Sequence, residues 1–205
     1  MVIEHQITAD RVEVNNEAKL LALDYIYYRL SKSGYPWYNH PVLAEPQHVN
    51  LVMRELGDEF EKRYSETYGE MSSLLNLAMT TTYVNFAAVC DELFRGEDYY
   101  KVDGRISIKW SRIVALFVFG GLLAIECVRN GLEDRISDIA DWIYIYIRSR
   151  LSYWICKHGG WDGLIKFYEM RETNQTWDSI KTTMTTVGAA MGVVALAVLV
   201  ANRLY

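Results

Sequence analysis

The sequence predicts an all-α fold, a helical bundle around a central hydrophobic helix hairpin, followed by a C-terminal transmembrane helix. Apolar residues recur at steps of three and four, and no stretch of useful length alternates as a strand would. Residues 113–125 carry no polar side chain, which indicates a helix buried on every side. Residues 182–201 carry no charge, and at about 1.5 Å per residue they reach roughly 30 Å, the thickness of a bilayer core. We therefore expect a bundle over residues 1–180 and a membrane anchor over residues 182–201, although a C-terminal core helix is the alternative for the anchor.

Capping residues and apolar stripes predict the first two helices. Asn15 and Asn16 can cap a helix that begins near Glu17, and Gly34 with Pro36 would end it. Its apolar stripe consists of Leu20, Leu23, Tyr27 and Leu30. The second helix follows a short connector and carries one stripe at steps of four, three and four residues: Val49, Met53, Leu56 and Phe60.

The middle and end of the bundle are predicted in the same way. Residues 72–89 indicate one or two shorter helices with a threonine-rich joint at 80–82, and residues 96–108 indicate a surface loop. Gly120 and Gly121 lie inside the apolar run, where they favour close helix packing. The second arm of the hairpin is expected over residues 136–154, with a buried face made of Ile139, Trp142, Ile143, Ile147 and Leu151.

Composition limits the classes of function. A 51% apolar content is enough for a full core, and a net charge of −5 with no basic stripe argues against nucleic acid as a partner. Cys90, Cys127 and Cys156 are widely spaced, so we expect reduced, buried thiols in a protein that faces the cytosol. The first residues have no basic segment followed by an apolar run, so we expect no signal peptide.

No motif for catalysis stands out. The four histidines share no metal-ligand spacing with one another, and the Cys156–His158 pair lacks second partners. The chain has no P-loop, dinucleotide fingerprint or nucleophile elbow. We therefore expect a protein that is not an enzyme and that uses no metal or cofactor, and recognition of a partner is the remaining role.

Four stretches resemble the homology motifs of the Bcl-2 family of apoptosis regulators, and of its pro-survival members in particular. The family numbers its homology motifs from one to four. Residues 28–37 (YRLSKSGYPW) are similar to the fourth motif, and residues 53–60 (MRELGDEF) are similar to the third, which is called the death motif. Residues 92–95 (ELFR) with 110–121 (WSRIVALFVFGG) are similar to the first motif, and residues 154–168 (WICKHGGWDGLIKFY) are similar to the second. The resemblance implies a Bcl-2-like helical bundle.

The resemblance also implies a groove that binds the death-motif helix of a partner. Arg112 would pair with the ligand's aspartate, since a guanidinium meets a carboxylate with two hydrogen bonds. On the residues alone, Arg112 could instead face solvent or pair with Glu92, and the aromatic side chains could simply be core. The implied groove residues are Phe60, Tyr64, Tyr68, Met71, Val89, Glu92, Leu93, Lys109, Ser111, Arg112, Ala115, Phe119 and Tyr168.

Some positions depart from the family pattern. Ser111 stands where glycine is usual and Lys109 where asparagine is usual, so Ser111 would narrow the set of ligands tolerated. The 96–108 loop is longer than usual and would sit beside the groove mouth. The 39–47 connector is shorter than that of many relatives.

The resemblance implies an anti-apoptotic protein that sequesters the death-motif helices of pro-apoptotic relatives. It would be tail-anchored in the mitochondrial outer membrane and face the cytosol, with the endoplasmic reticulum as the alternative membrane. Dimerisation with itself or a relative, through Gly188 and Gly192, is left open. The alternatives are a pore-forming pro-apoptotic effector of the same fold and a tail-anchored membrane-organising protein without a groove.

Overall fold

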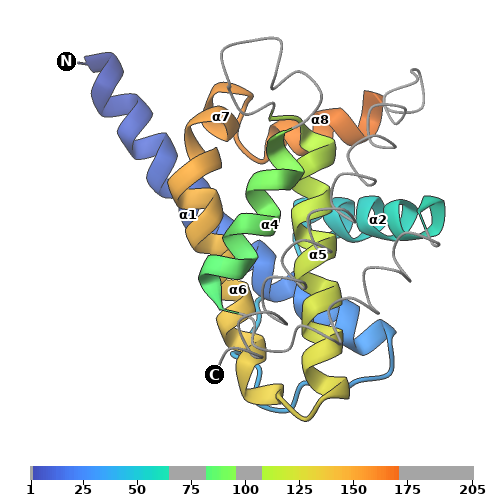
Figure 1. The fold of residues 1–205 in the computed structure, drawn as a ribbon. Coiled ribbons are helices and arrows are strands. Elements are labelled where there is room, and N and C mark those ends of the chain that lie inside the picture. Colours follow the sequence, from blue (N-terminus) through green and yellow to red (C-terminus); the bar gives the residue numbers. More distant parts are fainter. Residues whose placement is uncertain (1, 65–81, 96–107, 171–205) are drawn as a thin grey trace.

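The computed structural model describes residues 2–64, 82–95 and 108–170 of the chain, and those residues form helices and connecting turns without a strand (Figure 1). This confirms the all-α prediction, while the expected membrane anchor lies outside the described residues. The helical elements are α1 (Val2–Lys32), α2 (His48–Arg63), α4 (Tyr83–Arg95), α5 (Trp110–Arg129), η2 (Glu133–Arg135), α6 (Ile136–Tyr146), η3 (Ile147–Leu151), α7 (Ser152–Lys157) and α8 (Asp162–Met170).

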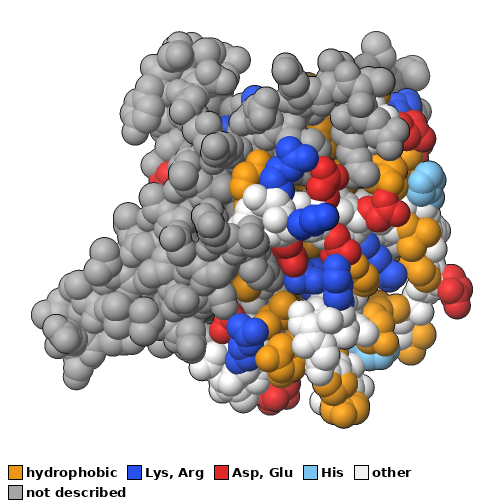
Figure 2. Space-filling model, turned by 90° about the vertical axis from the view of Figure 1, so that its right-hand side faces the viewer, with side chains coloured by type: hydrophobic (Ala, Val, Ile, Leu, Met, Phe, Trp, Pro, Cys, Tyr) orange, Lys and Arg blue, Asp and Glu red, His pale blue; other side chains and the backbone are white. Residues whose placement is uncertain are grey.

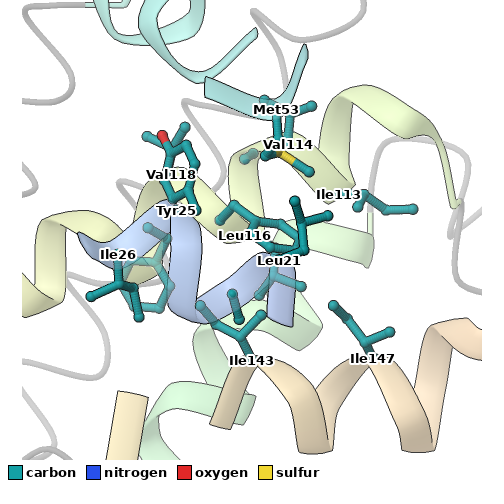
Figure 3. Packing of buried hydrophobic residues seen from close by; sticks show 14 of the residues in the cluster. Leu21, Tyr25, Ile26, Met53, Ile113, Val114, Leu116, Val118, Ile143 and Ile147 are labelled. Carbon is teal, nitrogen blue, oxygen red and sulfur yellow. The ribbon is translucent and has the colours of Figure 1, made fainter. Parts of the chain in front are cut away.

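Helix α5 is the centre of the bundle, and α1, α2, α4 and α6 all pack against it. Every residue from Trp110 to Cys127 is buried, so the central helix extends beyond the predicted residues 113–125 at both ends. Side chains from α1, α2 and α6 converge on it in Figure 3. Among the described helices, α5 alone has the length and composition to cross a membrane, and 94% of its most apolar window is buried inside the bundle. Its apolar surface is therefore explained by packing.

The predicted hairpin forms between α5 and α6. The chain turns after α5 through Gly131, which has a φ of 69°, and the Leu132 N–H donates to the Cys127 carbonyl at 2.8 Å. A Cβ on Gly120 would lie 2.5 Å from Ile143 Cδ1, and a Cβ on Gly121 would lie 2.9 Å from Arg29 Cγ. The two glycines therefore allow α5 to lie close to α6 and α1, as predicted.

The buried face of the second hairpin arm is also as predicted, with these side chains buried: Ile139, Trp142, Ile143, Ile147 and Leu151. The arm is not a uniform α-helix, because one π-helical turn, η3, separates α6 from α7. Such a turn adds a residue to the helical repeat and shifts the side chains that follow it.

The prediction for the first helix is wrong about its start and, in part, about its buried face. Helix α1 begins at Val2, so Asn15 and Asn16 lie inside it and do not cap it. Of the predicted stripe, Leu30 is buried and Leu23 and Tyr27 pack partly buried against the core, but Leu20 is 59% exposed. The most deeply buried face consists mainly of Val14, Ala18, Leu21, Ala22, Tyr25, Ile26 and Leu30. The predicted end is confirmed, since Gly34 has a φ of 77° and the Tyr35 N–H donates to the Leu30 carbonyl at 2.9 Å.

The second helix is confirmed, with Met53, Leu56 and Phe60 fully buried on one face of α2. Helix α4 begins at Tyr83 and continues past residue 89 to Arg95. Most of the predicted threonine-rich joint and the loop expected over 96–108 lie outside the described residues, except for Thr82 and Ile108.

Candidate functional site

The fourth and third motifs lie on the facing helices α1 and α2, where polar side chains join them. The Tyr28 hydroxyl donates a hydrogen bond of 2.5 Å to Asp58, and the Lys32 ammonium lies 2.5 Å from the same carboxylate. Asp58 is the aspartate of this chain's own death-like motif. The death-like motif of this chain is therefore held against α1 through its aspartate.

Two further ion pairs cross the same helix interface. Arg54 makes two hydrogen bonds to Asp24, at 2.5 and 3.1 Å, and Arg29 donates to Glu61 at 2.5 Å. The Arg29 side chain is 5% exposed and that of Glu61 16% exposed. On the side of the molecule where α2 lies, Figure 2 shows acidic and basic side chains intermingled. Charges that belong to the two motifs thus contribute to the α1–α2 contact.

We expect the protein to lose stability as the pH rises toward neutral. Burial raises the pKa of Glu61 to about 7, against the attraction of Arg29. The folded protein therefore retains a proton that the unfolded chain releases above pH 4.5 or so, and the resulting stabilisation disappears as the pH passes through about 7. Denaturant unfolding at about pH 5 and about pH 8 should differ by on the order of 2 to 3 kcal/mol from this group.

The control for this pH dependence is Glu61→Gln, whose amide does not titrate. Its stability should change less between the two pH values than that of the unmodified protein. Equal changes in both proteins would show that Glu61 does not titrate in this range.

The first and second motifs meet through tryptophans. The Trp110 ring lies 5.2 Å from that of Trp154 and 6.2 Å from that of Trp161, between centroids. Trp161 is buried, and its indole N–H donates to the Val14 carbonyl of α1 at 3.0 Å. This tryptophan cluster fixes the α7–α8 turn to α5 and α1, so Trp154 and Trp161 have a structural role.

Arg112 lies at the junction of α4 and α5. It sits in the first turn of α5 and is 6% exposed, so the alternative in which it faces solvent is wrong. Its guanidinium donates to the Phe94 carbonyl at 3.3 Å. That carbonyl lies at the C-terminal end of α4, where the helix dipole favours a cation.

The apolar candidates on α4 and α5 are brought together, because α4 packs along α5. Phe119 stacks on Phe86 of α4 with 5.4 Å between ring centroids. The four predicted side chains on these helices are at most 4% exposed: Val89, Leu93, Ala115 and Phe119. A partner helix can contact them only after they become accessible.

The remaining apolar and aromatic candidates that the structure describes lie on or next to α2 and on α8, which pack against each other. Phe60 is buried and its ring lies 5.0 Å from that of Tyr64, while the Tyr168 hydroxyl donates to the Glu55 carboxylate across the α2–α8 contact. Tyr68 and Met71 lie outside the described residues.

The polar candidates differ in exposure. Lys109 is exposed at the N-cap of α5, Ser111 is buried at 4% exposure, and Glu92 on α4 is half-buried. Lys109 is therefore more accessible than Arg112 to an incoming carboxylate. The buried Ser111 hydroxyl stands where the family pattern has no side chain.

The thiols have no sign of nucleophilic activation. Cys90, Cys127 and Cys156 are free, and the first two are buried. Burial raises the pKa of Cys127 to about 11 and that of Cys90 well above its usual value, so both stay protonated at neutral pH. Within the described ranges, no group of three or more His, Cys, Asp or Glu side chains could hold a metal ion.

Sequence reasoning missed the residues that connect the motifs. Asp24 and Glu61 were not predicted to have a role, and neither was the contact of Trp110 with both tryptophans of the second motif. The ion pairs join positions about 30 residues apart, so no helical spacing reveals them.

Comparison with known proteins identifies the family. Residues 53–161 match the sequence model of the Bcl-2 family, described as apoptosis regulator proteins. Apoptosis regulator Bcl-2 of Gallus gallus is 37% identical over 145 residues, which cover 69% of this chain and 58% of that protein. Apoptosis regulator R1 of Xenopus laevis is 33% identical over 190 residues, which cover 87% of this chain and 78% of that protein.

A third relative, Bcl-2-like protein 1 of Sus scrofa, is 39% identical over 120 residues, which cover 58% of this chain and 47% of that protein. The matched part of this chain thus spans less than two thirds of the Gallus gallus and Sus scrofa relatives. The family match covers the whole of the third and first motifs, residues 154–161 of the second motif, and more than half of the chain. The chain belongs to the Bcl-2 family of apoptosis regulator proteins.

Proposed function

We propose that this protein is a pro-survival regulator that sequesters the death-motif helices of pro-apoptotic relatives. The observation that carries the proposal is Arg112, a buried guanidinium held at the α4–α5 junction beside a cluster of apolar side chains. An amphipathic ligand helix needs both features, apolar contacts along one face and a cation for its aspartate. Relatives named apoptosis regulator Bcl-2 support a role in apoptosis, and the resemblance of residues 28–37 to the fourth motif of pro-survival members supports the protective direction.

Binding in this groove requires a rearrangement. Phe60, Leu93 and Phe119 are 1%, 1% and 2% exposed, so a ligand helix must replace the contacts that now bury them. The free energy needed to break those contacts makes the net free energy of binding less favourable, so the observed affinity is lower. A ligand must therefore offer large apolar side chains in addition to its aspartate.

Calorimetric titration of the full-length protein with death-motif peptides from pro-apoptotic proteins tests the proposal. We expect saturable one-to-one binding that is lost when the peptide aspartate is replaced by alanine. Arg112→Ala should weaken binding about tenfold or more, which is about 1.4 kcal/mol or more. Lys109→Ala is the companion variant, since it removes one positive charge from the same turn of the chain and tests the other candidate partner of the ligand aspartate.

Each result has a distinct meaning. A larger loss for Lys109→Ala than for Arg112→Ala would assign the ligand aspartate to the exposed lysine. Absence of saturable binding to any death-motif peptide would favour a membrane-organising protein without a groove. Release of cytochrome c from isolated mitochondria by the added protein would favour the pore-forming effector.

The membrane part of the proposal rests on residues 182–201. We propose that this segment anchors the protein in the mitochondrial outer membrane with the bundle in the cytosol, the endoplasmic reticulum being the alternative. A variant that lacks these residues should remain in the supernatant after alkaline extraction of cell membranes. Retention of that variant in the membrane pellet would contradict the assignment.

A further inference from the structure

A hollow of about 460 Å³ lies between the N-terminal half of α1, the start of α2 and the α7–α8 turn. Five apolar side chains line it: Val14, Val49, Cys156, Trp161 and Ile165. Two of these, Val14 and Trp161, are buried in the core, and the other three pack against it. The volume is in the range of pockets that bind small molecules, and it is large enough for a few neighbouring side chains of a bound peptide.

The rim of this hollow is acidic. Asp10, Glu13 and Glu17 of α1 and Asp162 of α8 all line it. Of the described residues in its lining, none is lysine or arginine, and His48 is the one basic side chain. Burial raises the pKa of Glu17, and the nearby charges of Glu13 and Asp162 raise it further. A cation brought to this rim would therefore relieve a repulsion that the lining itself does not neutralise.

The hollow is built on fixed parts of the fold. The hydrogen bond from the Trp161 indole to the Val14 carbonyl, 3.0 Å long, ties its two sides together. The Gly160 N–H donates to the Ile155 carbonyl at 3.0 Å and closes the turn between α7 and α8. None of the eleven candidate groove residues that the structure describes lines the hollow. It is therefore separate from the proposed death-motif groove.

We propose that this hollow binds a basic segment of a partner protein, in which an apolar side chain is flanked by lysine or arginine. The apolar side chain would contact Trp161 and Ile165, and the basic groups would approach Glu13 and Glu17. Charge complementarity selects this occupant over an acidic or neutral peptide. The described residues also offer no three-ligand group for a metal ion.

The experiment uses the full-length protein and a short helical peptide composed of lysine, leucine and alanine, with leucine and lysine on adjacent faces. Titration followed by nuclear magnetic resonance should shift the Trp161 indole N–H signal in a saturable way. The Glu13→Gln/Glu17→Gln variant should bind this peptide about tenfold more weakly or worse. The control Glu133→Gln/Asp134→Asn removes the same charge from the other end of the bundle and should bind normally.

Three results would overturn the proposal. One is unchanged affinity in the Glu13→Gln/Glu17→Gln variant. Another is equal binding of a peptide whose leucines are replaced by serine, which would show charge attraction without use of the hollow. The third is a parallel loss of death-motif peptide binding in the same variant. Since that binding should otherwise be unchanged, failure here is distinguishable from failure of the proposed groove.

Discussion

Arg29→Ala is expected to lower the free energy of unfolding by about 3 to 5 kcal/mol, the cost of breaking a buried ion pair from one side. The Arg29 side chain is 5% exposed, and its guanidinium lies 2.5 Å from the Glu61 carboxylate. Removal of the cation leaves Glu61 between α1 and α2 with less compensation for its burial. The aliphatic part of the Arg29 side chain also packs against Gly121 of α5, so truncation to alanine opens space next to the central helix. Because the pKa of Glu61 is raised to about 7, urea denaturation at about pH 8, where the carboxylate is ionised, measures the loss.

The matched control is Lys19→Ala, which breaks the ion pair with Asp141 on the surface. Both side chains of that pair are about half exposed, at 46% and 49%, so its loss should change the stability by less than about 1 kcal/mol. The double replacement Arg29→Met with Glu61→Leu should recover much of the stability, because neither partner is then left alone. A loss below about 1 kcal/mol for Arg29→Ala would contradict the argument.

Gly163→Ala is expected to destabilise the protein by about 3 kcal/mol, at the upper end of typical overpacking costs. A Cβ at this position would clash with the His158 carbonyl oxygen and lie 2.7 Å from Trp110 Cζ2. The first of these is a backbone atom in the α7–α8 turn, so no rotamer change relieves the contact. The turn or α8 must move, which disturbs the tryptophan cluster. Thermal unfolding should show a drop in Tm of roughly 6 to 12 °C.

Gly34→Ala is the matched control for this steric effect. Gly34 has a φ of 77° but no atom lies within 4 Å of its expected Cβ. The cost there is conformational only, about 1 kcal/mol. If both variants lost the same stability, the contact with the His158 carbonyl would not be the cause of the effect at Gly163.

The parts of the fold that follow from periodicity could be predicted from the sequence. A helix without polar side chains needs neighbours on all sides, so the apolar run predicted the position of the central helix α5. The apolar stripe of α6 was predicted because its residues recur at regular steps of three and four. The buried face of α1 could be found only in part in this way. It contains Ala18 and Ala22 together with the buried charges Asp24 and Arg29, whereas the large Leu20 is exposed. The size and polarity of the α1 side chains, considered without the helices that pack against them, therefore indicate a partly wrong face of the helix as the buried one.

The start of α1 was missed for a related reason. Asn15 and Asn16 have the side chains that favour an N-cap, but the helix continues through them. Tertiary contacts with α7 and with Trp161 stabilise this part of the helix. Local propensity does not contain that information.

The candidate groove followed from family resemblance, and composition alone would have placed the same aromatic residues in the core. The structure brings the described candidates onto α4, α5 and the α2–α8 pair, but their burial could not be predicted, because it depends on every segment that packs over them. The acidic hollow was not predicted at all. Its lining comes from residues 10–17, 47–49 and 156–165, which are far apart in the sequence.

The long-range contact between α1 and Trp161 also has a consequence during synthesis. The hydrogen bond to the Val14 carbonyl cannot form until Trp161, which lies 147 positions later in the chain, has been synthesised. At about 5 to 20 residues per second, a ribosome needs roughly 7 to 30 s to supply it. Throughout that interval the apolar faces of α1 and α5 lack part of their cover, so the nascent chain should be a client of chaperones that bind exposed hydrophobic segments.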